Sequence, residues 1–340
     1  MSLPFILYPK HLHEPIIQEE IRMNHKRRCR YLLIYALLCS ILVGCGLFVG
    51  EIPEGQIMNS TSKDHFVMIG RISYHYTEYP AAGKDILFIH GFASSTYTWE
   101  KVAPLLNKLG YHVWALDMKG FGWSDKPKDV PYDPLTLTEE VYQWMGVMGL
   151  RNVVLVGNSL GGGITTLMTL QHPEVVSRMV LIDAAAYNTK FPFIMKMASM
   201  PLSAEMTKLF FSRWMVRQTL SEVYYHEDWI TKDQVEAYYN RARTQNALNA
   251  QIAVVRDLKF SRVEKYVNRI PEIKCRALVI WGEDDRWIPL SSAYRFNKEL
   301  RDASLVIIPK CGHMPQEEYP DITAKLIDAF IQDKPLTVYR

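Results

Sequence analysis

Six short apolar runs lie between residues 86 and 308, each bounded by turn-forming or charged residues. Such runs, separated by helical stretches like Leu135–Met148, are typical of strands buried on both faces. Strands of this kind form a parallel sheet that carries helices on each side. An antiparallel pair, Phe66–Ile69 and Arg71–Thr77, is expected to turn at Gly70 and open the sheet. The six runs are Ile86–Ile89, His112–Leu116, Val153–Val156, Met179–Ile182, Ala277–Trp281 and Leu305–Ile308.

The alternation of strands and helices is interrupted between residues 186 and 260. This segment contains no strand-like run and is helical, aromatic and rich in Met. Such an insertion between two strands predicts a helical lid over the carboxyl ends of the sheet. We therefore expect a core formed by residues 66–185 and 261–335, with a final helix at Ile322–Ile331, and a lid at residues 186–260.

An uncharged run of twenty residues, Tyr31–Gly50, precedes a short polar linker at residues 51–65. As a helix this run would be about 30 Å long, the thickness of a bilayer core. The basic stretch His25–Arg30 before it predicts that the N-terminal end stays cytoplasmic and that the following residues are exported. Residues 1–50 are thus expected to form a cytoplasmic tail and a membrane-targeting helix, with the main domain outside the cytoplasm.

Two forms of membrane attachment remain open. Leu42–Cys45 resembles the lipobox of bacterial lipoproteins, in which Cys45 would carry lipid and become the new N-terminus. A start at Met23 would then make the preceding run a signal peptide of the usual proportions. However, Leu47–Val49 continue the apolar run past the cysteine, as an uncleaved anchor at residues 31–50 would. Soluble secretion and a buried helix are the remaining interpretations.

The net charge of +3 does not come from the expected core. Residues 1–45 hold six Lys and Arg and three acids, so that of the totals of 39 and 36, 33 of each sign remain in residues 46–340. A neutral core lacks the basic excess of a nucleic-acid-binding domain. We therefore expect no nucleic-acid partner.

The string Gly-Asn-Ser-Leu-Gly-Gly at residues 157–162 stands between the strand run Val153–Val156 and a helical run. A serine at such a junction lies on a sharp turn, which small neighbouring residues permit. Its Oγ projects above the sheet at a helix N-terminus, where developing negative charge is stabilised. Ser159 is therefore predicted to be a nucleophile, and a turn that merely joins strand and helix is the alternative.

A serine hydroxyl needs a general base, and the base needs an orienting carboxylate. Acids follow the fifth apolar run at Glu283, Asp284 and Asp285, and His313 follows the sixth. Because the carboxyl ends of parallel strands meet at one edge of the sheet, these side chains are expected near Ser159. The order serine, acid, histidine therefore predicts a catalytic triad.

The chain resembles the α/β-hydrolase superfamily, in its lid-bearing branch, over about residues 65–335. Besides the serine string, His90-Gly91-Phe92 after a strand and the segment Asp117–Pro127 are typical of this branch. The resemblance implies the α/β-hydrolase fold, a mostly parallel sheet with helices on both faces and an inserted lid. The site residues that it implies are Ser159 as nucleophile, Asp285 as acid, His313 as base, and the backbone N–H groups of Phe92 and Leu160 as the oxyanion hole.

Other polar residues near these motifs have alternative interpretations. Asp284 is expected to be a loop residue that faces solvent, while Asp183 stands where some relatives place the acid. His90 is expected to brace its loop rather than carry a proton, and Asp117 to cap the turn after its strand.

The resemblance implies a serine hydrolase that cleaves a carboxylic ester, with an apolar acyl or lipid-like substrate, through an acyl-enzyme intermediate. No metal site and no metal or organic cofactor are expected. Relatives with halide or epoxide chemistry carry Asp at the elbow, so Ser159 argues against both.

Two alternatives to ester hydrolysis remain. The first is C–C bond hydrolysis of vinylogous diketones by relatives that share the Gly-Asn-Ser-x-Gly-Gly string. Polar or positive residues in the lid pocket would favour it, whereas an apolar pocket would favour esters. The second alternative is a non-catalytic, ligand-binding member of the fold.

Overall fold

The computed structural model describes residues 58, 60–187, 211–258 and 260–336. The predicted membrane segment at residues 31–50 lies outside the described residues, as does the part of the predicted lid at 188–210. None of the helices in the described ranges is both long and apolar enough to cross a membrane.

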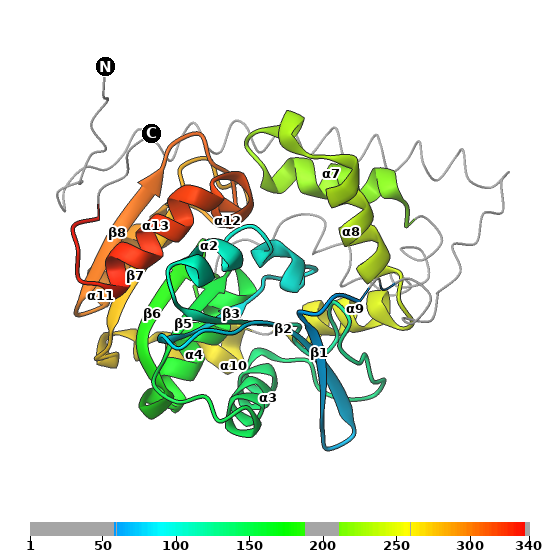
Figure 1. Cartoon of the computed structure of the whole chain (residues 1–340), viewed down its shortest axis with the longest axis horizontal. Coiled ribbons are helices and arrows are strands. Elements are labelled where there is room, and N and C mark those ends of the chain that lie inside the picture. The colour runs from blue at the N-terminus through cyan, green and yellow to red at the C-terminus, as the bar shows by residue number, and fades with distance from the viewer. Residues whose placement is uncertain (1–57, 59, 188–210, 259, 337–340) are drawn as a thin grey trace, which may run out of the picture.

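An eight-stranded sheet forms the centre of the fold, in the order β1-β2-β4-β3-β5-β6-β7-β8 (Figure 1). β1 pairs antiparallel with β2 and β2 antiparallel with β4, and all further neighbours are parallel. Seven of the eight predicted runs lie within one strand each, and the eighth, Arg71–Thr77, does so except for Arg71 in the turn, so the predicted sheet is confirmed. The strands are β1 (Asp64–Ile69), β2 (Ile72–Tyr79), β3 (Asp85–Ile89), β4 (His112–Leu116), β5 (Val153–Asn158), β6 (Val176–Ile182), β7 (Arg276–Gly282) and β8 (Ala303–Ile308).

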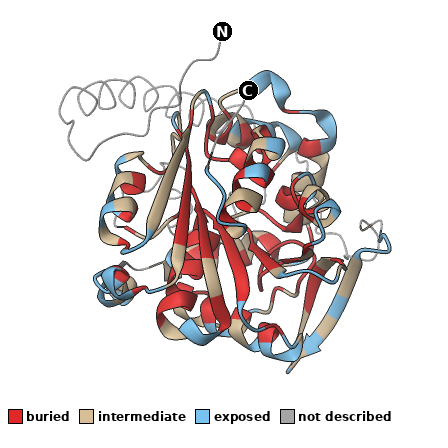
Figure 2. Cartoon of the chain, turned by 60° about the vertical axis from the view of Figure 1, so that its left-hand side comes forward, coloured by how far each residue is buried: buried red, intermediate tan, exposed pale blue. Residues whose placement is uncertain are grey.

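Helices cover both faces of this sheet, because successive side chains of a strand point to opposite sides. Ile86 and Phe88 of β3 belong to the apolar layer that includes α2 and α13, whereas Leu87 and Ile89 belong to the layer with α3 and α4. The central strands are buried along most of their length, and exposed residues lie on the outer helices, on loops and on the edge strand β1 (Figure 2). The helices of these layers are α2 (Ala103–Lys108), α3 (Pro134–Val147), α4 (Leu160–Gln171), α11 (Ser291–Glu299), α12 (Pro315–Glu318) and α13 (Pro320–Ile331).

A helical segment follows β6 and precedes β7, and its described part, residues 211–258, is here called the insertion. It contributes apolar residues such as Phe211, Leu220 and Tyr239 to a cluster that also contains Met314 and Trp287 of the core. The insertion therefore packs against the loops that follow β7 and β8. Its helices are α7 (Arg213–Val223), α8 (Lys232–Ala242) and α9 (Ala247–Asp257), and α10 (Phe260–Val267) leads back to β7.

Candidate active site

Ser159 occupies the turn between β5 and α4, as predicted. Its backbone has φ 54° and ψ −120°, a left-handed conformation that is strained for a residue with a Cβ. The neighbouring glycines make this turn possible: a Cβ on Gly157 would lie 2.2 Å from the carbonyl oxygen of Gly161, and one on Gly161 would lie 2.1 Å from that of Ile89. The turn therefore holds the nearly buried serine at the carboxyl end of β5 and the start of α4.

His313 and Asp285 form a hydrogen bond, with His313 Nδ1 2.7 Å from Asp285 Oδ2. Both side chains are almost completely buried. The other oxygen, Asp285 Oδ1, accepts the backbone N–H groups of Trp287 at 2.7 Å and Ile288 at 3.1 Å. The carboxylate is therefore fixed in orientation and holds the imidazole with Nδ1 as the donor.

The second imidazole nitrogen, His313 Nε2, is buried and has no hydrogen-bond partner among the described residues. With Nδ1 protonated toward Asp285, Nε2 carries a free lone pair, as a general base requires. Of the acids considered from the sequence, Asp285 holds the imidazole, whereas Asp284 donates its backbone N–H to the carbonyl oxygen of Cys311 at 2.9 Å.

Asp183, the alternative position for the acid, also lies beside this pair. One ligand atom each of Asp183, Asp285 and His313 lies within 4.8 Å of the others. The Asp183 side chain is fully buried, and Oδ1 accepts the N–H of Gly282 at 3.1 Å. Burial raises the pKa of Asp183 well above its usual range, and Asp285 raises it further.

These three residues are also the group among the described residues whose atoms could approach a metal ion. The 2.7 Å separation of His313 Nδ1 and Asp285 Oδ2 is that of a direct hydrogen bond. A neutral carboxyl at Asp183 would also be a poor ligand, because metals bind the deprotonated form. The arrangement therefore suits a hydrogen-bonded network better than a cation.

Asn158, the residue before the serine, links the elbow to the histidine loop. Its Nδ2 donates to the carbonyl oxygens of His313 at 3.1 Å and Ile182 at 3.2 Å. Asn158 is 1% exposed, so both bonds are shielded from water. Sequence reasoning assigned it no role, although the residue stands inside the serine string and only a polar side chain there could bridge two loops.

The predicted oxyanion groups lie on the two segments that flank Ser159. A Cβ on Gly91, the residue before Phe92, would lie 3.0 Å from Ser159 Cβ, so this loop passes directly beside the serine. Leu160 is the first residue of α4. No described residue accepts a hydrogen bond from the N–H of Phe92 or Leu160, which leaves both donors available to an oxygen held at Ser159.

His90 and Asp117 hold the surrounding loops, as expected from the sequence. His90 is fully buried, with Nδ1 2.7 Å from the carbonyl oxygen of Gly91, and its Nε2 accepts the N–H of Met118 at 3.1 Å. Asp117 accepts the N–H groups of Thr96 at 2.6 Å and Trp123 at 2.8 Å. The loop that carries Phe92 is thus fixed from both sides.

Two consecutive buried acids on α12 join the insertion to the histidine loop. Glu317 accepts hydrogen bonds from Tyr224 OH at 2.5 Å, from Tyr238 OH, and from Thr98 Oγ1 at 2.6 Å. Glu318 accepts the N–H of Gly312, next to His313, at 2.7 Å. Its other oxygen accepts the N–H groups of residues 225 and 226 at 2.9 and 3.0 Å.

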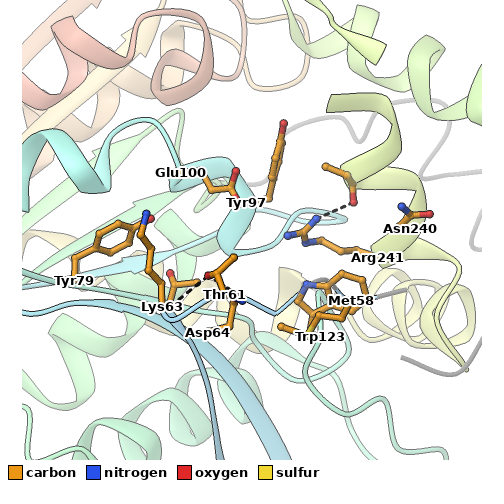
Figure 3. Close-up of a pocket in the computed structure, with 12 residues that line it drawn as sticks. Met58, Thr61, Lys63, Asp64, Tyr79, Tyr97, Glu100, Trp123, Asn240 and Arg241 are labelled. Atoms are coloured by element: carbon orange, nitrogen blue, oxygen red, sulfur yellow. Dashed lines mark hydrogen bonds between the residues drawn. The ribbon is translucent and has the colours of Figure 1, made fainter. Parts of the chain in front are cut away.

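A separate cavity of about 400 Å³ lies between α8, β1 and the loop after β3 (Figure 3). The Arg241 guanidinium lies 5.2 Å from the Tyr97 ring centre and 5.1 Å from that of Trp123. Lys63 and Glu100 line the same cavity. Its lining contains none of the predicted catalytic residues.

The chain is similar in sequence to known proteins. A family model described as alpha/beta hydrolase fold matches residues 85–320. The chain is 28% identical over 281 residues to the uncharacterized hydrolase YugF of Bacillus subtilis (strain 168), with 81% of this chain and 100% of that protein covered.

Two further relatives have different named activities. Lipase 1 of Psychrobacter immobilis is 28% identical, with 73% of this chain and 77% of that protein covered. The 2-hydroxy-6-oxononadienedioate/2-hydroxy-6-oxononatrienedioate hydrolase of Comamonas testosteroni is 27% identical, with 73% and 88% covered.

Two solved structures that are similar to this chain also have different names. A serine hydrolase involved in carbazole degradation is 25% identical with a TM-score of 0.68, and 80% of this chain and 99% of that chain are covered. A structure named membrane phospholipase A, a bacterial virulence factor, is 25% identical with a TM-score of 0.65, and 94% and 97% are covered.

Proposed function

Because this chain belongs to the alpha/beta hydrolase fold family and is a hydrolase of that family, we propose that it cleaves a carboxylic ester through an acyl-enzyme intermediate. The observation that carries this proposal is the hydrogen bond between His313 and Asp285. The backbone carbonyl oxygen of His313 accepts a hydrogen bond from Asn158, the residue before Ser159. A nucleophile, a base and an orienting acid together are what acyl transfer requires.

In the proposed reaction, His313 Nε2 takes the proton of Ser159 Oγ as that oxygen attacks the ester carbonyl. Asp285 keeps the proton of the imidazole on Nδ1 and stabilises the imidazolium that forms. The N–H groups of Phe92 and Leu160 donate to the oxyanion, and each such donor contributes roughly 3–4 kcal/mol in the transition state. His313 then returns the proton to the leaving alcohol, and water activated by the same residue releases the acid.

The proposed substrate has an apolar acyl group, since apolar residues flank the site. The ring centre of Trp287 lies 5.6 Å from that of His313. Trp287 and Met314 both belong to the apolar cluster of the insertion. Arg213 and Arg217 of the insertion are engaged elsewhere, with Glu236 and with the carbonyl oxygen of residue 230. In this proposal the insertion acts as the lid over the acyl pocket.

The second candidate is C–C bond hydrolysis, which the named activity of the Comamonas testosteroni relative supports. A doubly charged dienedioate would need cations facing Ser159, and the apolar contacts of Trp287 and Met314 favour the ester instead.

A substrate panel separates the two reactions. The purified full-length chain in detergent would be assayed with p-nitrophenyl esters of graded chain length and with a vinylogous diketone from ring cleavage. We expect ester hydrolysis that is lost in Ser159→Ala and improves with chain length. Turnover of the diketone without any ester hydrolysis would overturn the proposal in favour of C–C cleavage.

We also propose that residues 31–50 attach the protein to a membrane with the hydrolase domain outside the cytoplasm. The uncharged run behind a basic stretch supports this proposal. Similarity to a protein named membrane phospholipase A over 94% of this chain is consistent with it.

A further inference from the structure

Two buried carboxyl groups meet at the candidate site, and only one of them is used by the proposed mechanism. Asp183 directly follows β6 and has a left-handed conformation with φ 44°, and its backbone N–H donates to the carbonyl oxygen of Ile280 at 3.1 Å. A positive φ is uncommon for residues with a Cβ, and the Asp183 side chain lies beside that of Asp285. One carboxyl oxygen of Asp183, one of Asp285 and one ring nitrogen of His313 lie within 4.8 Å of one another.

The surroundings of the two carboxyl groups differ. Asp285 accepts three donors, namely two backbone N–H groups and His313 Nδ1. Asp183 accepts one, the N–H of Gly282, and its Oδ2 is buried without any partner among the described residues. Donors stabilise the charged form, and two adjacent buried carboxylates cannot both ionise. The single proton of the pair therefore belongs on Asp183 Oδ2.

We infer that Asp183 is a positioning residue that stays protonated and donates a hydrogen bond through Oδ2 to the carboxylate of Asp285. This inference rests on the proposed function, because it concerns how Asp285 acts on His313. The donated hydrogen bond withdraws negative charge from Asp285, so that Asp285 holds the imidazolium less strongly. His313 then remains a free base to a lower pH than an isolated Asp–His pair would allow.

Two other titratable groups, Glu318 and Cys311, lie near Asp183. Neither of them supplies the proton of the Asp183–Asp285 pair. Glu318 on α12 is occupied by backbone donors, including the N–H of Gly312 at 2.7 Å. Cys311 lies 3.7 Å from Glu318 and its thiol is kept neutral, because burial raises its pKa well above the usual range. Burial likewise raises the pKa of Asp183, and Asp285 raises it further, in the direction that the contacts require.

The test measures how fast a fluorophosphonate probe labels Ser159 at different pH values, which reports on His313 as a base whatever the natural substrate is. Asp183→Asn keeps a neutral group that accepts from Gly282 and donates to Asp285, so the midpoint of the acid limb should stay in place. Asp183→Ala removes the donor, and the midpoint should rise by roughly half to one pH unit. Thermal unfolding would establish that both variants are folded.

Three results would overturn the inference. A midpoint that falls in Asp183→Asn would show that Asp183 is ionised, because the variant then loses a negative charge near the imidazolium. Identical midpoints in all folded forms would show that Asp183 has only a structural role. Absence of labelling in the wild type would overturn the proposed function, and the inference with it.

A second measurement does not depend on the folding of Asp183→Ala. The infrared carbonyl band of a protonated carboxylic acid should be present in the wild-type protein at neutral pH and absent in Asp183→Asn. If the wild-type and Asp183→Asn spectra showed no difference in this band, Asp183 would not be protonated in the wild type.

Discussion

The side-chain amide of Asn158 donates to the backbone carbonyl of His313 at 3.1 Å, across 155 residues of sequence. The residue next to the predicted nucleophile thus fixes the loop that carries the predicted base. Since Asn158 also donates to the carbonyl oxygen of Ile182, the ends of β5 and β6 and the loop after β8 meet on one amide group. This shared contact ties the segment that carries Ser159 to the backbone of His313.

We expect Asn158→Ala to lower kcat for ester hydrolysis by roughly 10- to 100-fold, because a small displacement of His313 disturbs proton transfer. Two buried carbonyls lose a donor, so the free energy of unfolding should also fall by about 1–3 kcal/mol. Asn107→Ala is the matched control, since Asn107 Nδ2 also donates to backbone carbonyls, those of Tyr79, Pro80 and Tyr111. The control should lose stability but keep kcat, and equal losses of kcat would contradict the positioning role.

Two substitutions of Ser159 should both abolish activity but differ in stability, with the Gly variant more stable than the Ala variant. Both Ser159→Ala and Ser159→Gly lack the nucleophilic oxygen and should show no ester hydrolysis. Only Gly adopts φ 54° without strain, so Ser159→Gly should be about 1 kcal/mol more stable than Ser159→Ala in denaturant unfolding. Labelling of either variant by a fluorophosphonate would refute the assignment of the nucleophile.

Asp285→Asn should lower kcat/KM by roughly 10³–10⁴-fold, because the amide no longer holds the imidazole in the required tautomer. Asp284→Asn is the control, since Asp284 is adjacent but does not bond to His313. Its kcat/KM should stay within about threefold of the wild type, in line with a substitution away from the reacting groups. If Asp183→Asn proved more damaging than Asp285→Asn, the acid would have to be placed after β6.

The pH dependence of the free energy of unfolding should report the protonation of His75. Its Nδ1 lies 2.7 Å from Asp117 Oδ2 and its Nε2 lies 2.9 Å from Asp64 Oδ1. Burial lowers its pKa, but the two carboxylates outweigh burial and raise it from 6.5 to about 8. The protonated form therefore stabilises the fold fully below pH 6.5, and this contribution is lost as the pH rises through 8. The shift corresponds to about 2 kcal/mol.

The measurement is the free energy of unfolding at about pH 6 and pH 9, for the wild type and for His75→Gln. The wild type should lose about 2 kcal/mol more than the variant over this range. Equal losses in both proteins would show that His75 is not protonated between its two carboxylates.

Cell fractionation tests the proposed location. The wild type should sediment with membranes, and protease added to spheroplasts should digest its hydrolase domain. If Cys45 is lipidated, Cys45→Ser should block maturation and leave the precursor at full length, whereas an uncleaved anchor at residues 31–50 would ignore the substitution. A soluble protein that is shielded from the protease would contradict export.

The sequence predicted the sheet and the order of the site residues because both depend on local patterns. Short apolar runs need only their own composition to indicate buried strands, and the glycines around Ser159 indicate the sharp turn directly. The choice of Asp285 over Asp284 as the acid depended on the family resemblance. In the structure, Asp285 is the residue that forms the hydrogen bond to His313.

Contacts between distant segments could not be predicted in this way. Asp183 and Asp285 are far apart in the chain, and only the register of β6 beside β7 brings them together. Glu317 and Glu318 form an acidic pair that, by its composition, is typical of an exposed helix, yet both are buried. A buried charge requires partners, and theirs come from the insertion and from the loop after β8, which local sequence does not specify.

The same two glutamates make the insertion a poor candidate for exchange between relatives. Their acceptor oxygens are matched to the hydroxyls of Tyr224 and Tyr238 and to the backbone at residues 225 and 226. A foreign lid grafted onto this core without those donors would leave buried carboxylates unpaired beside His313. Changes of specificity in this lineage are therefore expected to arise from substitutions within the existing lid, or from recombination events that carry α12 along with it.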